Sequence, residues 1–173
     1  ADLNLDGAQD VVLTSNDAAF ETLLGNNDGT VLAPVQSPVT RAVGASATAD
    51  LDGDGKIDLV IAPPTGPIQI WWGNGDGSFS SSTLLPALFG GVDQLAIRDM
   101  NGDGYWDIVL ENPLGIYVLI GNGDGTFRFP VFSRLTLPVN LAGIVPTGNA
   151  MAIGDFNRDG KLDIAIVGVT IDR

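Results

Sequence analysis

The chain has 173 residues, the length of one domain, and 45% of them are hydrophobic, so it can bury a core of ordinary size. It carries 8 basic and 21 acidic residues, and the formal net charge of −13 makes nucleic acid and anionic membrane surfaces poor partners. The chain contains no Cys and no His, which excludes disulfides, thiolate catalysis, His-based acid–base chemistry and the usual zinc sites.

An acidic pattern of nine residues occurs four times along the chain. We call these segments acidic loops 1 to 4, and they are residues 2–10, 50–58, 99–107 and 155–163. Side chains with oxygen atoms occupy loop positions 1, 3, 5 and 9, and Gly occupies position 6, where it allows a sharp bend. A short backbone that surrounds a hard cation with oxygen has this pattern. The repeats therefore predict up to four calcium sites.

A second motif follows each of the first three acidic loops after 22 or 23 residues. We call these segments glycine turns 1 to 3, and they are residues 25–30, 73–79 and 121–127. Asn and Gly accept positive φ angles, so we interpret them as hairpin turns rather than as second metal sites. The acidic loops are spaced by 48, 49 and 56 residues, and two motifs in phase predict a structural repeat.

Short apolar runs between the motifs predict β-strands. Their β-branched and nearly continuous composition is typical of strands buried on both faces, and no stretch has a capped helical period. Strands A enter the acidic loops, strands B leave them, strands C enter the glycine turns, and strands D leave them. The predicted ranges are 42–48, 92–97 and 150–153 for A; 11–14, 57–62, 108–110 and 162–167 for B; 20–24, 68–72 and 116–120 for C; and, for example, 126–132 for D.

Four antiparallel strands in each repeat form a sheet the size of one β-propeller blade. The chain is therefore predicted to be all-β, a single partial propeller domain over residues 1–173. Its thirteen strands make about three and a half blades, in approximate repeats 1–41, 42–91, 92–148 and 149–173. A closed ring has about four to eight blades, so we expect further blades of the same or another chain.

Antiparallel alternation places the acidic loops and glycine turns at one end of the sheets and the remaining links at the other. The predicted links are residues 15–19, 32–41, 63–67, 80–91, 112–115 and 131–149. The last of them holds the extra residues of the longest repeat. It is either a binding loop or a tolerated surface insertion.

Acidic loop 2 shows the expected ligands most clearly. Asp50, Asp52 and Asp54 offer side-chain oxygens, and Asp58 closes the cage with both of its oxygens. Lys56 supplies only its backbone carbonyl, so its side-chain charge is irrelevant to ligation and can point away. Asn stands at position 3 in the other loops, so the second site is predicted to be the tightest. Their predicted ligands are Asp2, Asn4, Asp6, Ala8 and Asp10; Asp99, Asn101, Asp103, Tyr105 and Asp107; and Asp155, Asn157, Asp159, Lys161 and Asp163.

Two alternatives to this metal site are weaker. An EF-hand needs a Glu at position 12 and flanking helices, but that position is Leu13, Ile61, Leu110 or Ile166, and strands are predicted on both sides. Magnesium retains several waters, whereas this cage consists of protein oxygens and is rich in carboxylates. The four loops hold 13 of the 21 acidic residues, and four calcium ions would bring the net charge from −13 to −5.

The acidic loops, the strands that follow them and the Gly-Asn-Gly-Asp-Gly turns resemble the FG-GAP/VCBS repeat family, the blades of integrin-α-type β-propellers. The resemblance covers nearly the whole chain. It implies calcium in each acidic loop and an extracellular role in adhesion, carbohydrate recognition or scaffolding, with ligands often met on the face opposite the metals. Acidic loop 1 departs from the pattern at Leu5 and at Ala8-Gln9, although its ligand positions are intact. The Phe-Gly and Gly-Ala-Pro elements of integrins are not evident, so the bacterial VCBS form is the closer match.

Three classes of function follow from these features. The leading one is a non-catalytic calcium-binding module, secreted or at the cell surface, that recognises a protein or glycan. Trp71, Trp72, Tyr105 and Trp106 are candidates for stacking on sugars, although core packing is the expected fate of most of them. The second is a structural subunit that assembles through open blades. The third is the non-catalytic part of a polysaccharide-active enzyme.

No catalytic residue is predicted, because no pair of the remaining charged groups has a diagnostic spacing. No apolar run of 18 residues predicts a membrane span. The remaining charged groups are Asp17, Glu21, Asp28, Asp76, Asp93, Glu111, Asp124, Asp172, Arg41, Arg98, Arg128 and Arg134.

Overall fold

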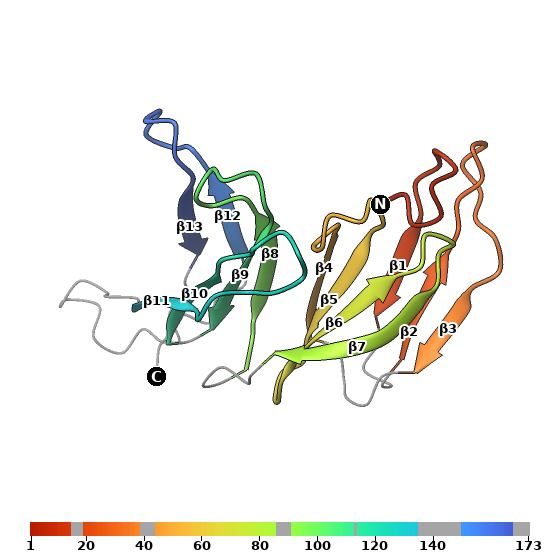
Figure 1. Cartoon of the computed structure of the whole chain (residues 1–173), viewed down its shortest axis with the longest axis horizontal. Helices are drawn as coiled ribbons and strands as arrows, with labels where there is room; N and C mark the ends of the chain where they lie inside the picture. The colour runs from red at the N-terminus through yellow and green to blue at the C-terminus, as the bar shows by residue number, and fades with distance from the viewer. Residues whose placement is uncertain (15–18, 39–43, 86–90, 113, 135–149, 168–173) are drawn as a thin grey trace.

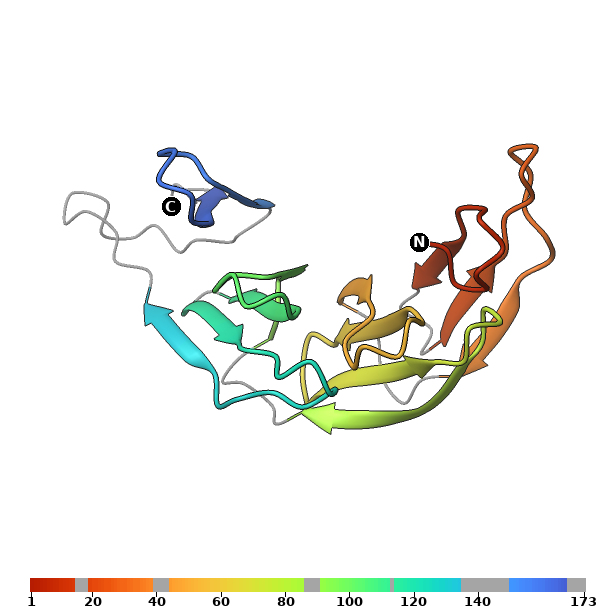
Figure 2. The same cartoon turned by 45° about the horizontal axis from the view of Figure 1, so that its top comes forward.

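The structure, a computed structural model, describes residues 1–14, 19–38, 44–85, 91–112, 114–134 and 150–167 (Figure 1). These residues contain thirteen strands and no helix, which confirms the prediction of an all-β chain. The strands form four antiparallel sheets, which we call blades 1 to 4. The blades follow one another along an open arc and do not close a ring (Figure 2). Within the described ranges, no helix is long and apolar enough to cross a membrane.

The strands are distributed over the blades as predicted, in groups of three, four, four and two. Blade 1 contains β1 (Val11–Thr14), β2 (Ala19–Leu23) and β3 (Val35–Pro38). Blade 2 contains β4 (Ala45–Ala49), β5 (Asp58–Ala62), β6 (Ile68–Gly73) and β7 (Phe79–Leu85). Blade 3 contains β8 (Gln94–Arg98), β9 (Asp107–Asn112), β10 (Gly115–Leu119) and β11 (Val131–Arg134). Blade 4 contains β12 (Ala150–Gly154) and β13 (Asp163–Val167).

Strand β5 shows why the apolar runs are continuous rather than alternating. All five of its residues are buried. Val60 and Ala62 belong to an apolar cluster shared with blade 3, whereas Leu59 and Ile61 belong to a cluster shared with blade 1. Because successive side chains of a strand point to opposite faces, a blade covered on both faces needs an apolar residue at every position.

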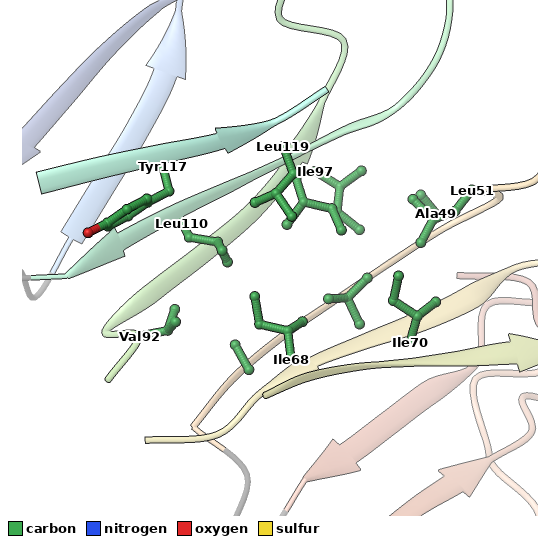
Figure 3. Close-up of a cluster of buried hydrophobic side chains, with 12 residues drawn as sticks. Ala49, Leu51, Ile68, Ile70, Val92, Ile97, Leu110, Tyr117 and Leu119 are labelled. Carbon is green, nitrogen blue, oxygen red and sulfur yellow. The ribbon is translucent and has the colours of Figure 1, made fainter. Parts of the chain in front are cut away.

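The larger of these two clusters lies between blades 2 and 3 (Figure 3). Ile68 and Ile70 of blade 2 pack opposite Leu110, Tyr117 and Leu119 of blade 3. The complete burial of each such side chain contributes about 1.5–3 kcal/mol to folding. The contact between neighbouring blades, rather than any single sheet, therefore provides most of the core.

The one range predicted for a strand D, residues 126–132, was wrong. Strand β11 begins at Val131 instead of residue 126, and Phe127 forms only an isolated bridge with Gly121. The predicted links 32–41, 80–91 and 131–149 contain all of β3, most of β7 and all of β11. An outer strand pairs with another strand on one side only, so polar residues are tolerated there. The sequence analysis therefore interpreted these segments as links. Apart from β11, the proposed insertion lies outside the described residues.

Candidate metal centres

The acidic loops and the glycine turns lie at the same end of the strands, as the antiparallel order requires (Figure 1). Acidic loop 2 joins β4 to β5, acidic loop 3 joins β8 to β9, and acidic loop 4 joins β12 to β13. Acidic loop 1 leads into β1. Acidic loops 2 to 4 thus connect neighbouring strands, and acidic loop 1 ends where β1 begins, so the strands limit the paths that each loop backbone can take.

The carboxylate at position 1 holds the backbone of each loop. In acidic loop 2, the Gly53 and Gly55 N–H groups donate to the two oxygens of Asp50 at 2.8 and 2.9 Å. Asp99 accepts equivalent bonds from Gly102 and Gly104. In the other two loops, position 1 accepts from the N–H groups of positions 5 and 6. The nine-residue pattern therefore folds into the same turn at four places.

Positions 3 and 5 continue this turn. The Asp54 N–H donates to Asp52 Oδ1 at 3.1 Å, and the Lys56 N–H donates to Asp54 Oδ1 at 2.9 Å. Position 5 is acidic in all four loops and accepts the N–H of position 7 in each. Hydrogen bonds from the Lys56 ammonium and N–H, together with its positive charge, lower the pKa of Asp54. The Asp54 carboxylate is therefore ionised at neutral pH.

Position 9 ties the acidic loop to the glycine turn. The Leu51 and Gly73 N–H groups each donate to one oxygen of Asp58 at 2.9 Å, and Asp10 and Asp107 accept equivalent pairs of bonds. Burial, and to a smaller extent the charges of Asp52 and Asp50, raises the pKa of Asp58 to about 6 against the opposing effect of the two hydrogen bonds. Any cation bound by Asp58 must use lone pairs that these hydrogen bonds leave free.

Three carboxylates converge in acidic loop 2. One oxygen from each of Asp50, Asp52 and Asp58 lies within 4.8 Å of the others. Three negative groups at this separation repel one another unless a cation lies between them. Hard oxygen donors suit calcium, so this part of the predicted ligand set fits the ion.

The structure does not bring Asp54 into this group. Its Oδ2 atom lies 2.8 Å from Lys56 Nζ, so the Lys56 side chain, which could have pointed away, pairs with a predicted ligand instead. The carboxylate at position 5 is the nearest partner for the ammonium. In the other loops, the Nδ2 atoms of Asn4, Asn101 and Asn157 donate to the same carboxylate position. The backbone carbonyls of Ala8, Lys56, Tyr105 and Lys161 remain predicted ligands.

Position 4 of the acidic loops has a requirement that the sequence analysis missed. Its φ angle is positive in every loop, at 62° for Leu5, 77° for Gly53, 76° for Gly102 and 65° for Arg158. Left-handed backbone costs a non-glycine residue roughly 1–2 kcal/mol. Gly53 and Gly102, which stand at loop position 4, were the sequence signal that could have revealed this requirement for a positive φ angle.

The four aromatic candidates divide into two pairs. Trp71 packs on the cluster shared with blade 1, and Trp72 packs on the cluster shared with blade 3, so both contribute to the core. Tyr105 and Trp106 lie in acidic loop 3 before β9 begins, and both are exposed. Core packing was expected for most of the four aromatic residues and holds for the first pair only. The rings of the second pair are exposed at the end of the molecule that carries the loops.

One buried acid lies away from the acidic loops. Glu111 of β9 is fully buried, and neither carboxylate oxygen has a hydrogen-bond partner. Burial raises its pKa, and the charge of Asp93 raises it further. Glu111 in blade 3 is equivalent to Ala62 in blade 2. Each lies two residues after a buried Val of the same strand. The sequence analysis named Glu111 only among the remaining charged groups and did not predict its burial.

Comparison with known proteins agrees with this arrangement. A family model described as FG-GAP-like repeat matches residues 2–61, 50–110 and 99–166. The chain belongs to the FG-GAP-like repeat family. Each match extends from one acidic loop to the strand that follows the next one, so the unit of this family includes the contact between consecutive blades.

Two solved structures share the fold of this FG-GAP-like chain. The Photorhabdus luminescens Tc holotoxin pore with the mutation TccC3-D651A matches with a TM-score of 0.56 and 18% identity, over 90% of this chain and 8% of that chain. BBS1N in complex with ARL6DN, soaked with lead, matches with a TM-score of 0.60 and 13% identity, over 97% of this chain and 49% of that chain. The chain thus spans less than half of either protein. No curated protein matches it.

Proposed function

We propose that this FG-GAP-like repeat chain binds calcium in its acidic loops and serves as a non-catalytic propeller module for recognition outside the cell. The convergence of Asp50, Asp52 and Asp58 carries the calcium part of the proposal. An ion there neutralises carboxylates that otherwise repel one another and fixes the connection between β4 and β5. Extracellular calcium is abundant enough to fill even sites with dissociation constants of about 10⁻⁴–10⁻³ M.

The backbone hydrogen bonds support this proposal because they position the oxygens before any ion binds. Asp50 and Asp52 accept hydrogen bonds from backbone N–H groups of their own loop, and these bonds restrict the conformations of their side chains. Pre-organised ligands lose less conformational entropy on binding. In each of the other three loops, positions 1 and 3 also accept backbone N–H groups from their own loop, which extends the proposal to four ions.

A calcium-dependent shift of the thermal unfolding midpoint tests this function. Each site would add about 2.7 kcal/mol of stability at a free calcium concentration one hundred times its dissociation constant. Calcium should therefore raise the midpoint, and a chelator should reverse the increase. In Asp50→Asn, which weakens the second site, the shift should be smaller. Asp93→Asn removes one charge from an exposed side chain away from the loops and should keep the full shift. Equal midpoints in calcium and in chelator would contradict the proposal.

Recognition of a protein or a glycan is the second part of the proposal. Its support is the exposure of Tyr105 and Trp106, since exposed aromatic rings stack on sugar faces and anchor protein partners. Binding to a glycan array that disappears in Tyr105→Ala would support the glycan form. A protein ligand is expected if the array shows no binding and an affinity capture from extracellular material depends on the same residue.

A structural role is the alternative function, and one specific observation supports it. The blades form an open arc whose first blade exposes apolar side chains, among them Val11 and Leu13. Large exposed apolar faces mark contact surfaces. A role as the non-catalytic part of a polysaccharide-active enzyme rests on the resemblance alone, and activity screening of the chain on anionic polysaccharides would test for catalysis.

A further inference from the structure

Glycine turns 2 and 3 are each hydrogen-bonded to two acidic loops. The first Gly of each turn, Gly73 or Gly121, donates its N–H to position 9 of the acidic loop in the same blade, at 2.9 Å. The last Gly, Gly77 or Gly125, donates its N–H to the carbonyl at position 2 of the acidic loop in the preceding blade, at 3.1 and 3.2 Å. The two turns therefore join acidic loops 1, 2 and 3 in one hydrogen-bonded series.

Leu51, at position 2 of acidic loop 2, lies between the candidate calcium ligands and blade 3. Its N–H donates to Asp58 Oδ2 at 2.9 Å, and its carbonyl accepts the Gly125 N–H. Its side chain is buried in the apolar cluster between blades 2 and 3 (Figure 3). Asp50 and Asp52, which flank Leu51 in the chain, are two of the three converging carboxylates. The backbone that positions the ligands is thus the backbone to which blade 3 binds.

The close approach of glycine turn 3 to acidic loop 2 requires Gly at residue 125. A Cβ atom at this position would lie 2.7 Å from Trp72 Cη2 and 3.3 Å from the Cβ atom of Asp52. The φ angle of Gly125 is 78°, in the left-handed region that Gly adopts without steric cost. Glycine turn 3 therefore packs directly against a candidate calcium ligand of the preceding blade.

We propose that a calcium ion in acidic loop 2 stabilises the contact between blades 2 and 3 through Leu51, and that an ion in acidic loop 1 stabilises the contact between blades 1 and 2 through Leu3. This inference rests on the proposed function, because it assigns a role to the same calcium sites. Without an ion, the three converging carboxylates repel one another and favour local opening of residues 50–53. Opening of this backbone separates the Leu51 carbonyl from the Gly125 N–H. An ion that binds only the closed loop opposes the separation.

The coupling between the ion and the blade contact is reciprocal, because any contact that stabilises the closed loop also raises the affinity of that loop for the ion. Glycine turn 3 binds the closed form of acidic loop 2 and therefore strengthens the second calcium site. Glycine turn 2 acts in the same way on acidic loop 1. The affinity of an acidic loop is thus set partly by the blade that follows it.

Hydrogen exchange of single backbone N–H groups, measured by NMR in calcium and in chelator, tests this coupling. The Gly125 N–H reports the contact with acidic loop 2, and the Gly77 N–H reports the contact with acidic loop 1 in the same sample. At a free calcium concentration one hundred times the dissociation constant, an ion that binds only the closed loop lowers the population of the open loop about one-hundredfold. We therefore expect calcium to slow the exchange of both groups by up to this factor.

Two matched variants separate the two contacts. Asp50→Asn weakens the second site and should reduce the calcium-dependent slowing at Gly125 more than at Gly77. Asp2→Asn weakens the first site and should reverse this order. Equal effects of each variant at the two glycines would show that calcium stabilises the chain as a whole, and this result would overturn the proposed coupling.

The reciprocal effect is measured as the calcium affinity of acidic loop 2, followed at the Gly55 N–H resonance. Gly125→Ala places a Cβ atom against Trp72 and Asp52 and should weaken the site about fivefold or more. The control is Gly29→Ala at the last Gly of glycine turn 1, where φ is 87° and, in the part of the chain that the structure describes, only chain neighbours lie within 4 Å of the added atom. This control should keep the affinity of acidic loop 2.

The outcomes distinguish the coupling from the proposed function. Calcium binding in equilibrium dialysis without any change in exchange at Gly125 and Gly77 would overturn the coupling and leave the proposed function intact. A chain that binds no calcium would contradict both. An unchanged affinity in a folded Gly125→Ala chain would also overturn the coupling. Circular dichroism shows whether that variant folds, and the exchange experiment decides alone if it does not.

Discussion

Acidic loops 2 and 4 share the nine-residue sequence pattern and the backbone turn that it forms, yet they lie in different surroundings. In loop 2, Leu51 is covered by blade 3, and Asp58 is buried and accepts two N–H groups. In loop 4, Phe156 is exposed, and Asp163 is half-buried and accepts the Phe156 N–H at 3.1 Å. The backbone turn is thus a local property of the pattern, whereas burial of its ends depends on the neighbouring blade.

The largest expected difference between the two loops concerns position 9. Asp58→Ala leaves two buried N–H groups without an acceptor, and each such group costs about 1–3 kcal/mol. Asp163→Ala releases one N–H at an exposed residue, where water replaces the carboxylate, so it should cost less than about 1 kcal/mol. Chemical denaturation of both variants in chelator measures the two losses. Equal losses would show that burial does not distinguish the loops.

The pH dependence of stability separates the loops next. The folded pKa of Asp58 is raised to about 6 from an ordinary value of 3.8, so the folded state holds its proton more tightly than the unfolded chain. The stability that this group contributes is present below the lower value and is lost as pH rises toward 6. In chelator, Asp58→Asn should flatten this decrease, whereas Asp163→Asn should leave it. In calcium, the wild type should lose less stability over the same range, because the ion binds the charged form.

The charge at position 3 provides a subtler comparison. Asp52→Asn gives acidic loop 2 the residue that the other loops carry and should weaken its calcium site on the order of tenfold, which corresponds to about 1.4 kcal/mol. Asn157→Asp should strengthen the fourth site by a similar factor. Calcium titration of both variants measures the changes. Opposite signs for the two exchanges are the expected outcome, and equal signs would contradict an electrostatic origin.

The smallest effect concerns position 4. Arg158 has a φ angle of 65°, a conformation that Gly adopts without the steric cost, so Arg158→Gly should stabilise the chain by about 1 kcal/mol. Gly53 in acidic loop 2 has a φ angle of 77°, so Gly53→Ala should destabilise it by a similar amount. Thermal unfolding of both variants is the check. A loss of stability in Arg158→Gly would indicate that the Arg side chain makes compensating contacts.

The sequence predicted the strands buried on both faces, because continuous apolar runs such as that of β5 have no other explanation in an all-β chain. It did not predict β3, β7 and β11 well, since an outer strand does not require apolar residues. It placed Asp50, Asp52 and Asp58 together, because position in a repeated turn fixes where side chains meet. The partner of Lys56 and the burial of Glu111 depend on contacts that spacing alone does not encode.

Calcium titration of the wild-type chain by isothermal calorimetry, after complete removal of metal, tests the central claim most directly. The convergent carboxylates of acidic loop 2 predict saturable binding with a dissociation constant no weaker than about 10⁻³ M, and the repeats predict a stoichiometry of up to four. A folded chain that releases or absorbs no binding heat at any temperature, and that retains no calcium in equilibrium dialysis at millimolar concentration, would contradict the account.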